Sequence, residues 1–186
     1  ALETCARLDD GAKSFAIVYG FWRFYLLRAD YAQAQVLSGE LMRLAALNSD
    51  EASAVTANRA VGSTKFYTAD FSNALRHLER TAGIHPHPEL RRTVLGYDVV
   101  DPWVVNHAYA GMALWISGHT EKAKAENELA IKLARRIDHP FTLSLALCFA
   151  QWTYQFEGDR RKVRELAQEA LDLSRRHNFA FWTGWA

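Results

Sequence analysis

The sequence predicts an all-α fold built from stacked pairs of antiparallel helices. Two observations support this prediction. Four similar polar breaks recur along the chain, each preceded by an aromatic-rich segment and followed by a charged one. The chain also lacks the strict alternation of apolar and polar residues that is typical of half-buried strands.

The four breaks predict helix–turn–helix junctions. Each contains Ala or Gly, which permits the tight turn that ends a helix. In three of them the next residue is Asp (Asp30, Asp70 and Asp159), which suits the N-cap of the following helix because its carboxylate accepts hydrogen bonds from first-turn amides. The breaks are "RADYAQA" (28–34), "TADFSNA" (68–74), "SGHTEKA" (117–123) and "EGDRRKV" (157–163).

The last residues of the breaks set a common register with spacings of 40, 49 and 40 residues: Ala34, Ala74, Ala123 and Val163. The longer middle spacing contains "HPHPELRRT" (85–93), which we interpret as an inserted, proline-broken loop. Twelve positions before the register residues stand Trp22, Gly62, Gly111 and Gln151. The two glycines predict that the helices of a pair approach most closely there.

The register gives four helix pairs in a single domain over 1–186: about 14–48, 51–84, 101–137 and 140–177. The first helix of a pair is called the A helix and the second the B helix. Partial helices are expected at both ends, in "ALETCARLDD" (1–10) and "NFAFWTGWA" (178–186). The absence of an initiator Met and the apolar C-terminal run suggest a fragment of a longer protein.

The repeat resembles the tetratricopeptide repeat (TPR), in which small residues recur at the eighth, twentieth and twenty-seventh positions. The stretches that fit best are "VGSTKFYTADFSNALRHLER" (61–80) and "AGMALWISGHTEKAKAENELA" (110–130). Trp22, Gln151 and Val163 depart from that pattern. The resemblance implies a right-handed superhelix of antiparallel helix pairs, an α-solenoid with one concave face.

Longer stretches resemble the C-terminal TPR region of bacterial multidomain signalling proteins. They are "YGFWRFYLLRADYAQA" (19–34), "GYDVVDPWVVNHAYAGMALWISGHTEKA" (96–123), "DHPFTLSLALCFAQWTYQFEGD" (138–159) and "HNFAFWTGWA" (177–186). In that family an ATPase domain precedes the TPR region, and an adenylate/guanylate cyclase or winged-helix domain lies at the N-terminus. The resemblance implies a non-catalytic regulatory or protein-interaction module.

Composition narrows the classes of partner. A net charge of +1 argues against nucleic acid or an anionic membrane as the main partner. Cys5 and Cys148 match no disulfide framework and read as buried thiols of a reducing compartment. With no visible signal peptide or membrane-spanning run, we expect a cytoplasmic location.

Catalytic motifs are not evident in the sequence. "GAKS" (11–14) and "GSTK" (62–65) lack the spacing of a phosphate-binding loop. A weak metal site at His85, His87 and Glu89 is conceivable, but an exposed loop with helix-breaking prolines is the favoured explanation, so we assign no catalytic, cofactor or metal residues. The expectation is that this chain is not itself an enzyme.

The register turns a set of A-helix residues toward the predicted concave groove. The arginines among them could bind a partner's carboxylate, and the tryptophans could anchor a peptide or helix. The alternatives are that other parts of the parent chain fill the groove, or that these residues are core. The predicted partner-binding residues are Tyr19, Arg23, Arg59, Ser63, Phe66, Met112, Trp115, Trp152 and Gln155.

Two further hypotheses remain open. The groove or the 85–93 loop could sense a small-molecule effector. The apolar end, with Phe181, Trp182 and Trp185 expected to be exposed, could mediate self-association.

Overall fold

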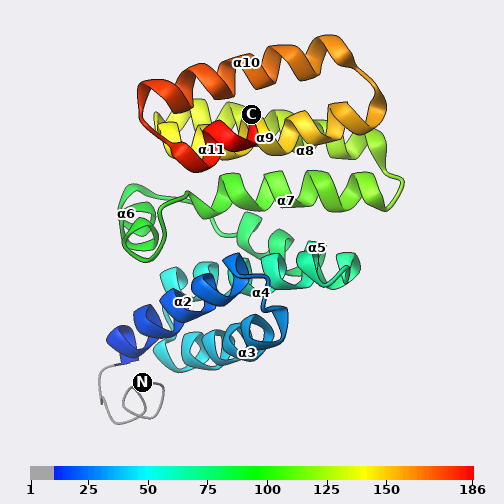
Figure 1. The fold of residues 1–186 in the computed structure, drawn as a ribbon. Helices are drawn as coiled ribbons and strands as arrows, with labels where there is room; N and C mark the ends of the chain where they lie inside the picture. The colour runs from blue at the N-terminus through cyan, green and yellow to red at the C-terminus, as the bar shows by residue number, and fades with distance from the viewer. Residues whose placement is uncertain (1–10) are drawn as a thin grey trace. The chain divides into compact units, whose positions relative to one another are not determined.

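The computed structural model describes residues 11–186, and their regular structure is entirely helical, which confirms the all-α class for this part of the chain. Expectations that concern 1–10, including Cys5, lie outside the described residues. The helices are α2 (Gly11–Leu27), α3 (Tyr31–Asn48), α4 (Glu51–Tyr67), α5 (Phe71–Ala82), α6 (Pro88–Tyr97), α7 (Pro102–Ile116), α8 (Thr120–Ile137), α9 (Pro140–Glu157), α10 (Arg160–Arg176) and α11 (Ala180–Trp185) (Figure 1).

The chain divides into two compact units, Ala1–Asp98 and Val99–Ala186. Each unit is described by itself below. A single solenoid domain over 1–186 therefore stays a prediction.

The predicted N-caps are confirmed. The carboxylates of Asp30, Asp70 and Asp159 each accept a hydrogen bond from the backbone amide three residues later, at 3.2, 3.4 and 2.9 Å. Each cap satisfies a first-turn N–H group that would otherwise have no partner within its helix.

The residues at the turns inside the four helix pairs differ in backbone strain between the two units. In the second unit Gly118 and Gly158 take φ values of 85° and 77°, which glycine adopts readily. In the first unit Ala29 and Ala69 take φ values of 58° and 60°. Their Cβ atoms make this left-handed conformation unfavourable by roughly 1–2 kcal/mol per residue. The first unit accepts that cost at both of its helix-pair turns.

The prediction that 85–93 forms an inserted loop is wrong, because α6 begins inside this segment. Pro88 lies in the first turn of α6, where the missing N–H costs nothing. His87 Nδ1 accepts the Leu90 amide at 3.3 Å and caps the helix. Leu90 and Val94 are buried, and α6 packs against α2 and α4.

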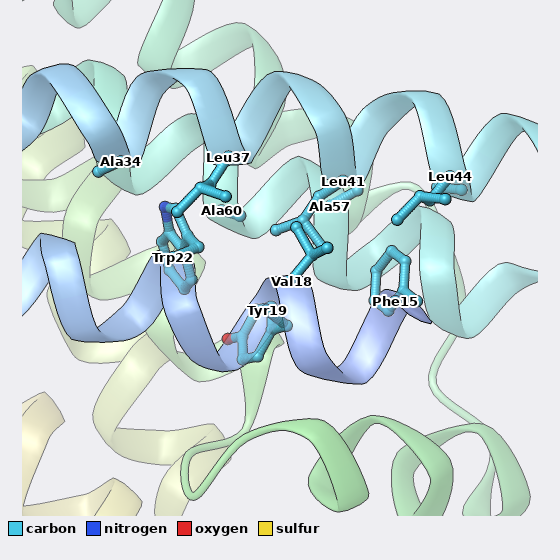
Figure 2. Close-up of a cluster of buried hydrophobic side chains, with 11 residues drawn as sticks. Phe15, Val18, Tyr19, Trp22, Ala34, Leu37, Leu41, Leu44, Ala57 and Ala60 are labelled. Atoms are coloured by element: carbon cyan, nitrogen blue, oxygen red, sulfur yellow. The ribbon is translucent and has the colours of Figure 1, made fainter. Parts of the chain in front are cut away.

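The core of the first unit forms where α2 meets α3 and α4 (Figure 2). Trp22 is fully buried, and its indole Nε1 donates a hydrogen bond to Thr64 Oγ1 at 2.9 Å. The buried apolar residues of this cluster are Phe15, Val18, Tyr19, Trp22, Ala34, Leu37, Leu41, Leu44, Ala45, Ala57 and Ala60.

Gly62 and Gly111 lie where the two helices of a pair touch, as predicted. A Cβ on Gly62 would stand 2.7 Å from Leu78 Cδ2 on α5. A Cβ on Gly111 would stand 2.4 Å from Asn127 Oδ1 and 3.1 Å from the Ala123 carbonyl oxygen on α8. Both of the shorter distances are below those of real Cβ contacts, so a side chain at either position would force Leu78 or Asn127 to move.

In the second unit, α7 packs against α8 and α9, and α9 in turn packs against α8 and α10. The short α11 lies against α9 and α10 (Figure 1). Among the helices of residues 11–186, none combines the length and apolar character needed to cross a membrane.

Candidate functional site

In the first unit, the predicted groove residues converge on an acidic residue that the sequence analysis did not single out, Asp98. This residue follows α6 directly and is buried. Tyr19 Oη donates a hydrogen bond to Asp98 Oδ2, and Arg23 Nη1 donates one to Asp98 Oδ1. Arg59 Nη2 lies 3.0 Å from Asp98 Oδ2, and Arg59 Nη1 donates to Tyr19 Oη at 2.7 Å. We call these four residues the Asp98 cluster.

The Asp98 cluster lies largely away from water. The side chains of Asp98 and Arg59 are 3 % and 6 % exposed, whereas that of Arg23 is 28 % exposed. The guanidinium of Arg59 also lies 5.4 Å from the centre of the Trp22 ring, a favourable cation–π distance. Burial raises the pKa of the Tyr19 hydroxyl well above its usual value, with the nearby Asp98 carboxylate adding to the effect and Arg59 opposing it. Tyr19 is therefore neutral at physiological pH and acts as a hydrogen-bond donor.

In this geometry Arg23 and Arg59 already bind a carboxylate of their own chain, that of Asp98. The sequence analysis expected them to bind a partner's carboxylate in a groove. In the structure, Arg59 is buried against Asp98, and Arg23 binds the other oxygen of the same carboxylate. Ser63 and Phe66, predicted for the same groove, are also buried. Of the five residues predicted in this unit, Arg23 alone keeps appreciable exposure.

In the second unit, the four predicted residues differ in burial and contact different neighbours. Met112 is buried in α7, and Gln155 is exposed near the end of α9. Trp115 is half-buried, and its ring stacks on that of Phe156 with a centroid distance of 4.8 Å. Trp152 stacks on Trp185 of α11 at 4.4 Å. Both tryptophans thus already use one ring face on aromatic residues of their own chain.

Only part of the C-terminal segment is exposed to solvent. Trp182 is 4 % exposed, and its ring meets that of Phe141 at 5.8 Å. The expectation that Trp182 lies open to another chain is therefore wrong, because α11 turns it inward onto α9. Phe181 is the exposed aromatic of this segment, at 53 %.

Several histidines of the chain accept hydrogen bonds from backbone amides or pair with neighbouring side chains. His87 and His139 each cap a helix through Nδ1. His107 Nδ1 lies 2.6 Å from Glu126 Oε2 on α8. Across 11–186, no group of three His, Cys, Asp or Glu side chains is arranged to hold a metal ion.

Cys148 is a buried free thiol in α9. Its burial raises the pKa of the thiol to about 12. Since the thiolate is the nucleophile, this cysteine is unreactive at neutral pH.

The chain matches no known protein-family model and no curated protein at a significant level. Its function is therefore argued below from its own residues.

Proposed function

We propose that the chain is a TPR-like, non-catalytic module that binds a protein partner, within a larger cytoplasmic signalling or regulatory protein. The observation that supports this is the repeated contact inside helix pairs. Gly62 of α4 and Gly111 of α7 occupy the same place in the repeat, and each meets the helix that follows it in the chain.

The pattern of helix contacts adds support. The A helix α7 packs against its own B helix α8 and against the next A helix α9, and α9 also packs against α8 and α10. This is the contact pattern of solenoid repeats, in which each repeat contacts its neighbours. Such arrays present A helices along one face, and that face commonly binds an extended segment of another protein.

Site-specific photo-cross-linking tests the proposal. A photoreactive phenylalanine analogue at Trp115 of α7 is expected to cross-link one defined protein in cells that express the full parent protein. The matched control carries the same analogue at Leu129, which is exposed on the B helix α8. Cross-links of equal yield and identity at both positions, or none at Trp115, would contradict binding through the A helices.

A second candidate function, effector sensing, has one observation in its favour. A hollow of about 330 Å³ lies between α8, α9 and α10, with Tyr154 on α9 and both acidic and basic side chains around it. Its lining is Asn127, Glu128, Ile131, Lys132, Arg135, Tyr154, Lys162, Glu165 and Leu166. A small zwitterion would find complementary charges there.

Thermal unfolding in the presence of single amino acids tests this second candidate. A ligand at 100 times its Kd stabilises the folded state by roughly 2.7 kcal/mol, which raises Tm measurably. The rise should shrink in a Tyr154→Ala variant. An unchanged Tm across the series would count against the hollow as a sensor.

A further inference from the structure

The first turns of α10 carry a concentration of positive charge that the sequence analysis did not assign to any site. Residues 160–165 read "RRKVRE", which gives four cations and one carboxylate. The chain as a whole has a net charge of only +1. This positive charge is therefore a local feature of α10.

Two of these cations differ from the other two in their partners. Lys162 Nζ lies 2.8 Å from Glu165 Oε1, and Arg161 Nη1 lies 3.7 Å from Glu165 Oε2, so both share the one carboxylate. Arg160 and Arg164 are exposed, and among the described side chains no acidic group pairs with either of them. As residues i and i+4 they project from the same side of the helix.

Both arginines line two shallow hollows. One, of about 400 Å³, lies between the end of α9 and the start of α10 and is also bordered by Gln155, Gly158 and Val163. The other, of about 500 Å³, lies along α10 and is also lined by Arg161, Glu165 and Gln168. Gly158 takes a φ of 77° at the turn, and its missing side chain leaves the first hollow open.

From this arrangement we infer that Arg160 and Arg164 form the docking site for an acidic, extended segment of a partner protein. This inference goes beyond the proposed function, because α10 is the B helix of its pair and the site is separate from the A-helix face. Guanidinium groups bind carboxylates through paired N–H···O hydrogen bonds, and two of them one helical turn apart match acidic residues spaced along a peptide. Gln155 supplies an uncharged amide at the edge of the same hollow.

The distribution of charge favours an acidic peptide over nucleic acid. A nucleic-acid backbone needs a continuous basic stripe, because it carries a phosphate at every nucleotide. Within the second hollow, the carboxylate of Glu165 is paired with Arg161 and Lys162. Further along α10, outside the lining of both hollows, stand Glu169 and Asp172. These carboxylates would repel a phosphate backbone running along the helix, whereas a short acidic segment can end before it reaches them.

Fluorescence anisotropy with a fluorescein-labelled hexaglutamate peptide tests the inference. The wild-type chain is expected to bind this probe, with affinity falling as salt is added. A double variant, Arg160→Gln with Arg164→Gln, should weaken binding about tenfold, since each exposed ion pair contributes roughly up to 1 kcal/mol. Circular dichroism checks that the helices are retained.

The matched control is Arg175→Gln with Arg176→Gln, which removes the same charge from the last turn of the same helix. The control should bind the probe as the wild type does. Equal weakening in both variants, or no binding by the wild type, overturns the inference. So does tighter binding of an oligouridylate of similar charge that the first variant abolishes, since this would assign the site to nucleic acid.

The outcome can be separated from that of the proposed function. If cross-linking at Trp115 persists in the Arg160→Gln, Arg164→Gln variant while hexaglutamate fails to bind, the module binds its partner elsewhere and only the docking site is wrong. If hexaglutamate binds as expected but no partner cross-links at Trp115, the acidic site stands and the A-helix face is wrong.

Discussion

Replacing Asp98 with Asn should destabilise the first unit more than any exposed charge change in the chain. The substitution keeps the size of the side chain but removes the negative charge that both Arg23 and Arg59 contact. Removing one partner of a buried ion pair typically costs about 3–5 kcal/mol, because the remaining charge stays away from water. Arg23 is 28 % exposed and can turn to solvent, so its part of the loss is small.

We therefore expect Asp98→Asn to lower the free energy of unfolding of the first unit by about 3 kcal/mol, most of it through Arg59. At roughly 1.4 kcal/mol per factor of ten, this raises the unfolded fraction about 100-fold. The Arg23→Gln variant should lose about 1 kcal/mol or less, since its partner keeps Arg59 and Tyr19.

The assay needs a probe that reports on the first unit alone. Trp22 is the one tryptophan within residues 1–98, and it lies against Arg59. With 5-fluorotryptophan incorporated, the Trp22 resonance in ¹⁹F NMR can be followed through urea unfolding and assigned with Trp22→Phe.

The control for Asp98→Asn is Asp172→Asn, which removes an exposed carboxylate on α10. It should leave the unfolding of Trp22 unchanged. If Asp98→Asn shifts the Trp22 transition no more than this control does, the Asp98 cluster does not stabilise the unit and our reading of it is wrong.

Three further predictions concern the second unit and the helix contacts. Gly111→Ala should lower the free energy of unfolding, measured with urea, by roughly 2–3 kcal/mol, because its Cβ would meet Asn127. Gly20→Ala, which has open space around it, should instead raise that free energy by up to about 1 kcal/mol. In a Cys5→Ser background, the Cys148 thiol should resist Ellman's reagent at pH 8 and react once urea unfolds the chain, and rapid native-state reaction would contradict its burial. Burial raises the pKa of the Cys148 thiol from 9.0 to about 12, so the unfolded state releases its proton first and stability falls as the pH rises from 9 toward 12. Thermal unfolding of Cys148→Ala should depend less on pH in this range than that of the wild type, while the buried Tyr19, whose pKa is also raised, keeps part of the dependence in both.

Features that depend on neighbours in the sequence could be predicted. The caps at Asp30, Asp70 and Asp159 bind amides only three residues away, so their spacing identifies them without any tertiary information. Gly62 and Gly111 were found by their common register.

Features that depend on distant contacts could not be predicted. Asp98 lies 79 residues from Tyr19 and 75 from Arg23, and no local pattern links them. The sequence signal was one of two acidic residues between α6 and α7, within "GYDVVDPW" (96–103), and the other, Asp101, caps α7. The prediction for 85–93 was wrong for a local reason. A proline breaks a helix when it lies in the helix interior, but it is accepted in the first turn, and the sequence alone does not say which of the two positions a proline takes.

The position of Asp98 bears on how the first unit folds during synthesis. A solenoid repeat can in general fold as soon as it and its neighbour have left the ribosome, since its contacts are local. Here the carboxylate that binds Tyr19, Arg23 and Arg59 comes at the end of α6, after both helix pairs have been made. A nascent chain that has released only α2–α5 holds the arginines without Asp98. The Asp98 cluster can therefore form only after residue 98 has emerged.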